Sequence, residues 1–383
     1  MPEDWQDGGF GLYIHWPFCQ AKCPYCDFNS HVHAQIDQRA WEAAYLSEID
    51  RVGAETQGRV LRSVFFGGGT PSLMDARLVD AILTRVRATW PLSNSCEITL
   101  EANPTSVEAG RFAGYRAAGV NRVSLGVQAL NDEDLRRLGR LHGVNEARAA
   151  LEIARETFAR VSFDLIYARQ NQSLADWEAE LRQALSYGTE HLSLYQLTIE
   201  EGTAFGARFA AGGLKGLPSE DLGADLYKLT QQICGEAGLP AYEISNHARP
   251  GEESIHNMLY WTGGDYAGIG PGAHGRLTLG AERWATETEL APLAWLRMVR
   301  ETGSGERERT ILSLADQRAE RLLMGLRTAR GVPMTLFPEE MSNFYKEVSD
   351  LEESEFARIS DDRLVLTAKG RPLLNAVAER LLA

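Results

Sequence analysis

The sequence predicts an α/β fold in which parallel strands alternate with helices. Six short runs of apolar, β-branched or aromatic residues occur between residues 11 and 197, and each has the length and composition of a buried strand. Stretches with apolar residues three or four positions apart separate these runs, as in amphipathic helices. Glycines and polar residues stand just after several runs. Six strand and helix units suit an open barrel or a doubly wound sheet.

The strand and helix units follow one another in order along the chain. Strands are expected at 11–16, 63–66, 96–101, 122–127, 161–167 and 191–197. Helices are expected at 37–54, 75–90, 107–118, 131–141 with 145–158, and 174–187. This alternation predicts parallel pairing with right-handed crossovers. In either architecture, functional side chains gather just past the C-terminal ends of the strands.

The pattern changes after about residue 215. The glycines between 263 and 272 exclude a single regular element there. Further helices are expected at 321–330, 338–355 and 372–382, with a hairpin of 357–360 and 363–367 between the last two. We therefore expect three parts, at 1–215, 216–305 and 306–383. The last resembles a winged helix, but residues 338–362 hold nine acidic side chains against Lys346 and Arg358, which favours a packing or partner domain over a DNA-binding one.

Charge and hydropathy exclude several classes of protein. The formal net charge of the 383-residue chain is −14, which opposes broad attraction to phosphate backbones, so we expect no nucleic-acid partner. The N-terminal residues lack the basic and apolar regions of a secretory signal, and no apolar run reaches membrane-spanning length. These features predict a cytoplasmic protein with no integral membrane segment.

Three cysteines directly follow the first predicted strand. Cys19, Cys23 and Cys26 form a C-x3-C-x2-C run with no fourth cysteine nearby. Thiolates this close together in a reducing compartment favour zinc or an iron–sulfur cluster over a disulfide. Zinc would need a fourth ligand, which His31 or His33 could supply. The remaining two cysteines, at 96 and 234, are expected to be buried small hydrophobes.

The cysteine run, together with Gly67-Gly-Gly-Thr-Pro71 after the second strand, resembles the radical S-adenosylmethionine superfamily. The resemblance implies a partial (β/α)6 barrel. It also implies that the three cysteines bind a [4Fe-4S] cluster whose open iron is chelated by S-adenosylmethionine. Tyr25 would offer an apolar face to the adenine, and Gly68, Gly69 and Thr70 would let the backbone approach the cofactor.

Further segments resemble one subgroup, the coproporphyrinogen III dehydrogenase-like proteins. They are 124–128, 138–142, 163–167, 194–200 and the C-terminal part. The resemblance implies that Tyr13 lies near the cluster and that Gln128 and Asp164 hold the ribose hydroxyls. It further implies that Arg140 pairs with the methionine carboxylate, a bond that a guanidinium forms well. Glu101 is expected in the same pocket. No catalytic residue is implied.

Two features favour the haem chaperones of the subgroup over its dehydrogenases. The dehydrogenases carry another cysteine two positions after the third ligand, where this chain has Phe28. Residues 256–261 have the H-N-x-x-Y-W form of the chaperones. His256 is expected to bind haem iron, as imidazole does in many haemoproteins, and Tyr260 and Trp261 to supply flat surface.

The expected function is therefore haem binding and delivery to an acceptor haemoprotein, for example a respiratory one. The alternative is oxygen-independent decarboxylation of coproporphyrinogen III, so the resemblance leaves open whether the chain is an enzyme. Radical modification of RNA is disfavoured by the charge and by the lack of an added basic domain.

Overall fold

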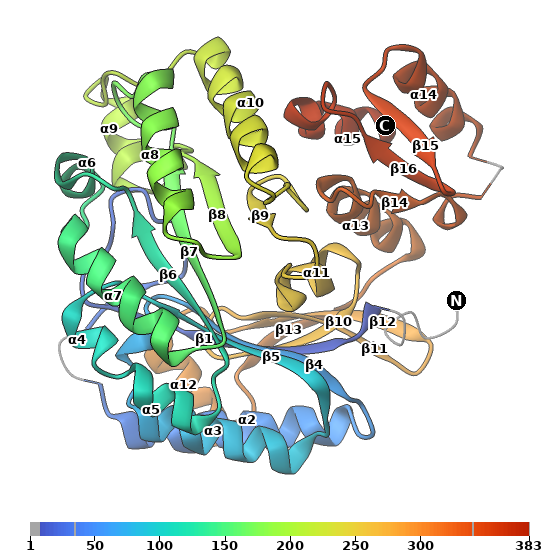
Figure 1. The fold of residues 1–383 in the computed structure, drawn as a ribbon. Coiled ribbons are helices and arrows are strands. Elements are labelled where there is room, and N and C mark those ends of the chain that lie inside the picture. The colour runs from blue at the N-terminus through green and yellow to red at the C-terminus, as the bar shows by residue number, and fades with distance from the viewer. Residues whose placement is uncertain (1–7, 34–35, 339–340, 383) are drawn as a thin grey trace.

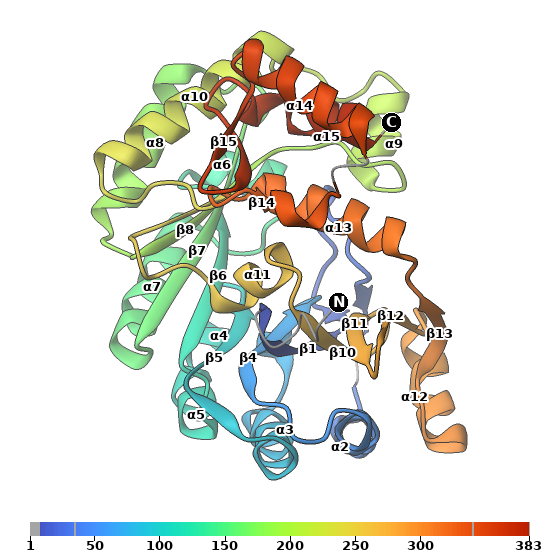
Figure 2. The same cartoon turned by 90° about the vertical axis from the view of Figure 1, so that its right-hand side faces the viewer.

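The computed structural model describes residues 8–33, 36–338 and 341–382. Its centre is a curved sheet of eleven strands in the order β13-β12-β11-β10-β1-β4-β5-β6-β7-β8-β9. Figure 2 shows this sheet as an arc with helices along its outer side and α11 inside the arc. The end strands β13 and β9 do not pair with each other among the described residues, so the arc stays open.

The six predicted strands form the parallel part of the sheet. They are β1 (Phe10–Trp16), β4 (Leu61–Gly68), β5 (Leu92–Ala102), β6 (Arg122–Gln128), β7 (Arg160–Tyr167) and β8 (His191–Gln196). Each pairs in parallel with the next. This confirms the predicted α/β fold with parallel strands. The short strands β2 (Phe18–Cys19) and β3 (His31–Val32) pair separately beside the end of β1.

The helices between these strands cover the outer face of the sheet (Figure 1). They are α2 (Gln38–Glu55), the 3-10 turn η1 (Pro71–Leu73), α3 (Ala76–Thr89), α4 (Ser106–Ala109), α5 (Phe112–Ala118), α6 (Asp132–Arg137), α7 (Val144–Thr157) and α8 (Leu174–Ser186). The single helix predicted at 107–118 is therefore two helices, which meet at Gly110 and Arg111. Gly110 ends α4 and the backbone turns before α5 begins. Similarly, the helix predicted at 131–141 ends at Arg137.

Residues 204–311 add elements that the sequence analysis did not predict. They are α9 (Ala204–Ala210), α10 (Glu220–Glu236), β9 (Asn246–Ala248), α11 (Ile255–Trp261), β10 (Asp265–Ile269), β11 (His274–Leu279), β12 (Glu282–Thr288), α12 (Pro292–Thr302) and β13 (Glu306–Ile311). Strand β10 pairs in parallel with β1, on the side opposite β4. The antiparallel strands β11, β12 and β13 continue the sheet from there.

A large apolar core lies between the sheet and its outer helices. The rings of Trp41 on α2 and Trp295 on α12 stack with their centroids 5.5 Å apart and their planes 4° apart. Both side chains are fully buried, and burial of large aromatic rings is among the strongest packing contributions in a core. This contact fixes the unpredicted helix α12 against the first helix of the parallel region.

The C-terminal residues build a second apolar core. Their elements are α13 (Leu314–Arg327), β14 (Val332–Pro333), the turn η2 (Met334–Leu336), α14 (Ser342–Glu353), β15 (Ala357–Ser360), β16 (Arg363–Leu366), the turn η3 (Arg371–Leu373) and α15 (Leu374–Leu382). The predicted hairpin is present as β15 and β16. The helix predicted at 321–330 begins earlier, at Leu314, and ends at Arg327, whereas α14 and α15 lie within a few residues of the helices predicted there. Residues 339–340 of the helix predicted at 338–355 lie outside the described residues. Within those residues, no helix combines the length and apolar character needed to cross a membrane.

Candidate functional site

The three neighbouring cysteines lie on the loop that follows β1. Each is half-buried, and each thiol contacts a different polar side chain. The Thr70 hydroxyl donates to Cys19 Sγ at 3.4 Å, Arg140 Nη1 donates to Cys23 Sγ at 3.4 Å, and Cys26 Sγ lies 3.8 Å from the Ser30 hydroxyl. All five cysteines of the chain are free thiols. The loop therefore presents three thiols, each with a donor nearby that suits a thiolate.

A cavity of about 150 Å³ opens beside these thiols. Its walls come from the C-terminal ends of β4, β5, β6 and β7, as parallel pairing predicts. The lining residues that the sequence analysis expected at a cofactor site are Cys19, Cys23, Tyr25, Cys26, Gly68, Gly69, Thr70, Glu101, Gln128, Arg140 and Asp164. The lining also includes Asn103 and Ser124, to which the sequence analysis assigned no role.

The glycine segment after β4 holds the cysteine loop. Gly69 N–H donates to the Trp16 carbonyl at 2.7 Å, and Thr70 N–H donates to the Phe18 carbonyl at 2.8 Å. A Cβ atom added to Gly69 would lie 2.7 Å from the Phe18 carbonyl oxygen, closer than real Cβ contacts allow. These backbone donors are therefore used on the chain itself, and absence of a side chain at Gly69 permits the close approach.

The acidic and basic side chains that line the cavity are Glu101, Asp164, Arg140 and Lys22. Burial raises the pKa of Glu101 to about 8, with a smaller contribution from Asp164. Burial likewise raises the pKa of Asp164 to about 6, although hydrogen bonds with Ser193 and Ser124 oppose the shift. Arg140 donates to the Asn103 side chain at 2.5 Å and to the Gly126 carbonyl at 2.7 Å. Among the described residues its buried Nε–H has no hydrogen-bond partner, so one donor stays available to a ligand.

Gln128 occupies an unusual backbone conformation at the end of β6. Its φ is +74°, in the left-handed region that residues other than glycine rarely adopt. Such strain is maintained when the surrounding structure needs the side chain in one place. The Gln128 amide lies over Gly126, where an added Cβ would be 2.9 Å from Nε2 and 3.4 Å from Arg140 Nη2. The strained turn thus brings Gln128 beside Arg140 in the cavity.

The donors of this cavity suit an iron–sulfur cluster together with a small zwitterionic ligand. Three thiols would bind three of the four irons and leave the fourth open, and Arg140 and the two carboxyl groups complement a carboxylate and an ammonium group. The volume is below the roughly 300 Å³ at which cofactor pockets usually begin. Among the described residues, no three histidine, cysteine, aspartate or glutamate side chains are arranged to hold a metal ion. His31 is bonded to Asn29 at 3.0 Å.

The raised pKa of Glu101 predicts a pH-dependent stability of the ligand-free protein. From about pH 4.5 to about pH 8 the folded chain holds a proton that the unfolded chain releases. The free energy of unfolding contributed by Glu101 therefore falls as pH rises through this window. Glu101→Gln removes the effect, so we expect the variant to gain stability over the parent as pH rises, by at most a few kcal/mol at pH 8. Denaturant unfolding of both proteins at several pH values measures the difference. A difference in the free energy of unfolding that does not change with pH would contradict the raised pKa of Glu101.

His256 lies on α11, inside the arc of the sheet. Glu97 of β5 holds the start of this helix by accepting from the backbone N–H groups of Ile255 and His256 at 3.3 and 3.2 Å. Glu97 is itself held by Arg160, whose Nη1 lies 2.6 Å from the carboxylate. These bonds attach α11 to strands β5 and β7 and so help to fix the position of the His256 side chain.

Both ring nitrogens of His256 are engaged. Nδ1 lies 2.8 Å from the Ser63 hydroxyl and Nε2 lies 2.7 Å from the Tyr260 hydroxyl, while the ring stacks on Phe65 at 4.8 Å. The side chain is 1% exposed. Burial lowers its pKa to about 3, so the imidazole is neutral, the form that binds metals. In this conformation Tyr260 covers the nitrogen that would face a ligand.

Tyr13 lies between the cysteine cavity and α11 rather than on the cavity wall. Its hydroxyl is 3.0 Å from His15 Nδ1, and its ring stacks at 6.3 Å from both Phe65 and His256. The structure thus does not bring Tyr13 among the residues that line the cysteine cavity. It places Tyr13 in an aromatic group that continues from β1 to α11.

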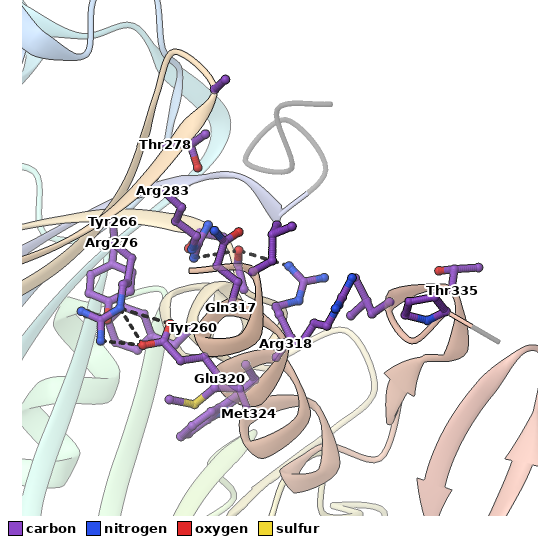
Figure 3. Close-up of a pocket in the computed structure, with 18 residues that line it drawn as sticks. Tyr260, Tyr266, Arg276, Thr278, Arg283, Gln317, Arg318, Glu320, Met324 and Thr335 are labelled. Carbon is purple, nitrogen blue, oxygen red and sulfur yellow. Dashed lines mark hydrogen bonds and ion pairs between the residues drawn. The ribbon is translucent and has the colours of Figure 1, made fainter. Parts of the chain in front are cut away.

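Tyr260 and Trp261 line a second and larger cavity of about 570 Å³ (Figure 3). We call it the slot. Its walls are the end of α11, strands β10 to β12, helix α13 and the turn after β14. His256 is not among the lining residues. Of the three motif side chains assigned to haem, Tyr260 and Trp261 therefore line the slot, whereas His256 lies behind them.

The chain is similar to several known proteins over most of its length. The Radical SAM superfamily profile matches residues 13–184, and the HemN C-terminal domain profile matches residues 312–373. The Escherichia coli protein named heme chaperone HemW is 45% identical over 70% of this chain and 70% of its own. The Mycobacterium tuberculosis protein of that name is 36% identical over 97% and 95%. The bovine mitochondrial radical S-adenosyl methionine domain-containing protein 1 is 37% identical over 97% and 87%.

One solved structure matches nearly the whole fold. It is the Escherichia coli coproporphyrinogen III oxidase HemN, described as a radical SAM enzyme, with a TM-score of 0.82 at 22% identity. The match covers 97% of this chain and 90% of that one. At this identity the likeness establishes the fold, including the C-terminal part.

Proposed function

The chain belongs to the radical S-adenosylmethionine superfamily and to its HemN- and HemW-like group, and from this we propose that it is a haem chaperone that passes haem to an acceptor haemoprotein. Relatives named heme chaperone support the proposal. The observation that carries it is the slot, where Tyr260 and Trp261 present aromatic surface to about 570 Å³ of space. This volume is within the range of cofactor sites, roughly 300–1,000 Å³.

The cysteine cavity is proposed to hold a [4Fe-4S] cluster and S-adenosylmethionine. Cys19, Cys23 and Cys26 would bind the cluster, which when bound supplies an open iron and one electron. Within the chain, the free Nε–H of Arg140 is available to the methionine carboxylate. Gln128 and Asp164 are the candidates for the ribose hydroxyls, and the remaining assigned residues are Tyr25, Gly68, Gly69, Thr70 and Glu101, with Tyr13 behind them.

His256 is proposed to bind the haem iron in the loaded state. The neutral imidazole favours this role, but its Nε2 is covered by the Tyr260 hydroxyl. Tyr260 must therefore move before iron can reach the ring. Tyr260 and Trp261 then serve as the flat surfaces against which the porphyrin packs.

Haem titration tests the proposed function. We expect the anaerobically reconstituted full chain to bind about one haem per chain, followed by the Soret band, and to lose that haem to an apo-haemoprotein added afterwards. Absence of tight haem binding would refute the proposal. Conversion of coproporphyrinogen III with reductant and S-adenosylmethionine would instead establish the dehydrogenase alternative, for which the HemN fold is the structural support.

A further inference from the structure

A second cavity, of about 750 Å³, lies next to the slot. The two share the lining residues Arg321, Thr335 and Leu336, so they are direct neighbours. We call the second cavity the arginine groove, because Arg321, Arg330, Arg358 and Arg363 line it and Asp361 is the acidic side chain among its described lining residues. The groove lies between the end of α13 and the β15–β16 hairpin.

The slot combines apolar surface with the charged side chains Arg276, Arg283, Arg318, Glu320 and Arg321. Its apolar lining includes Trp261, Leu314, Met324 and Leu336. Arg276 is paired with Glu320, with the closest contact at 2.7 Å (Figure 3). Arg283 is likewise paired with buried Asp265 at 2.9 Å. These two guanidinium groups are neutralised, and the apolar lining offers surface to a flat apolar body.

The arginine groove, by contrast, holds charge that the described residues do not neutralise. Arg330 and Arg358 are exposed, and neither side chain makes an ion pair or hydrogen bond with another described residue. Arg363 donates to the carbonyls of Arg330 and Gly331 at 2.7 and 2.8 Å, which are neutral acceptors. Gathering several cations in one groove costs mutual repulsion that a bound anion would relieve.

We propose that slot and groove together bind one amphiphilic dicarboxylate, with a flat macrocycle in the slot and both carboxylates toward Arg330 and Arg358. Haem has this build, so the inference rests on the proposed function and adds an orientation to it. The propionate edge faces the β15–β16 hairpin, and the opposite edge faces the sheet. Guanidinium groups suit this role because they bind carboxylates through paired N–H donors.

Comparing the binding of haem with that of its dimethyl ester tests the contribution of the groove separately from that of the slot. The ester carries the same macrocycle without free carboxylates. We expect the unchanged full chain to bind haem about tenfold more tightly than the ester. The double variant Arg330→Ala/Arg358→Ala should lose this preference and bind both ligands with the affinity of the ester. The matched control is Arg148→Ala/Arg208→Ala, which removes two exposed arginines of α7 and α9 and should keep the preference.

The outcomes separate the inference from the proposed function. If the unchanged chain binds haem tightly but binds the ester equally well, the orientation is wrong and haem binding stands. An equal loss of preference in the control pair would assign the effect to net charge and also overturn the orientation. If the chain binds neither ligand, both the inference and the haem chaperone proposal fail.

Discussion

Cys23→Ala is expected to abolish iron and sulfide incorporation. Only three thiols lie on the loop after β1, so the variant leaves two ligands for a cluster that needs three from the protein. The change also leaves Arg140 without its contact to the Cys23 sulfur, 3.4 Å away. A buried guanidinium without its thiolate partner further disfavours assembly. Iron and acid-labile sulfide, measured after anaerobic reconstitution, should both fall to background.

Cys234→Ala is the matched control for this loss. Cys234 lies on α10, is 0% exposed and belongs to the large apolar core. Its truncation should cost on the order of 1 kcal/mol in folding free energy and leave iron and sulfide unchanged. Full metal content in Cys23→Ala would show that the cluster assignment is wrong. We further expect Cys23→Ala to keep haem affinity, because the slot shares no lining residue with the cysteine cavity.

The parallel region was predictable because its signals are local. Each strand is a short apolar run, and several polar residues of the cysteine cavity stand in or just after a strand. Gln128 at the end of β6 and Asp164 within β7 come together because neighbouring parallel strands end at one edge. The family resemblance then connected these positions into one expected site. The strained turn at Gln128 was not predictable, because glutamine carries no signal for a positive φ.

The slot could not be predicted because non-local contacts build it. Strand β10 is short, and it finds its place through pairing of Asp265 with Phe10, far away in sequence. Buried Asp265 is held by Arg59 and Arg283 from two other segments. The spacing of apolar residues along the sequence carries no information about partners so distant in the chain. The arginine groove likewise combines residues from α13 and the β15–β16 hairpin, whose charges are scattered in the sequence.

The motif around His256 was predictable, but its hydrogen bonds were not. Sequence spacing places Tyr260 one helical turn after His256, which is consistent with their 2.7 Å contact. It does not reveal that Ser63 occupies the other nitrogen. The two bonds turn a candidate iron ligand into a buried group that needs a conformational change to act.

His256→Ala and Tyr260→Phe should therefore change haem binding in opposite directions. Tyr260→Phe keeps the flat ring but removes the hydroxyl from Nε2. A hydrogen bond of this kind contributes about 1 kcal/mol, so its loss should free the nitrogen and tighten haem binding several-fold. His256→Ala removes the iron ligand itself and should weaken binding tenfold or more. Soret titrations give both affinities, and the ferric haem spectrum should show imidazole ligation in Tyr260→Phe but not in His256→Ala.

Ser63→Ala separates ligation from simple loss of packing. It removes the partner of Nδ1 and leaves Nε2 and Tyr260 in place, so haem affinity should change little. Thermal unfolding of all three variants identifies any fall in affinity that follows from lost stability, since His256→Ala also leaves a cavity against Phe65. Equal weakening in Tyr260→Phe and His256→Ala, with imidazole ligation retained, would mean that His256 acts by holding Tyr260. The iron ligand would then have to come from another residue, and the hydroxyl of Tyr260 would be the group that haem binding requires.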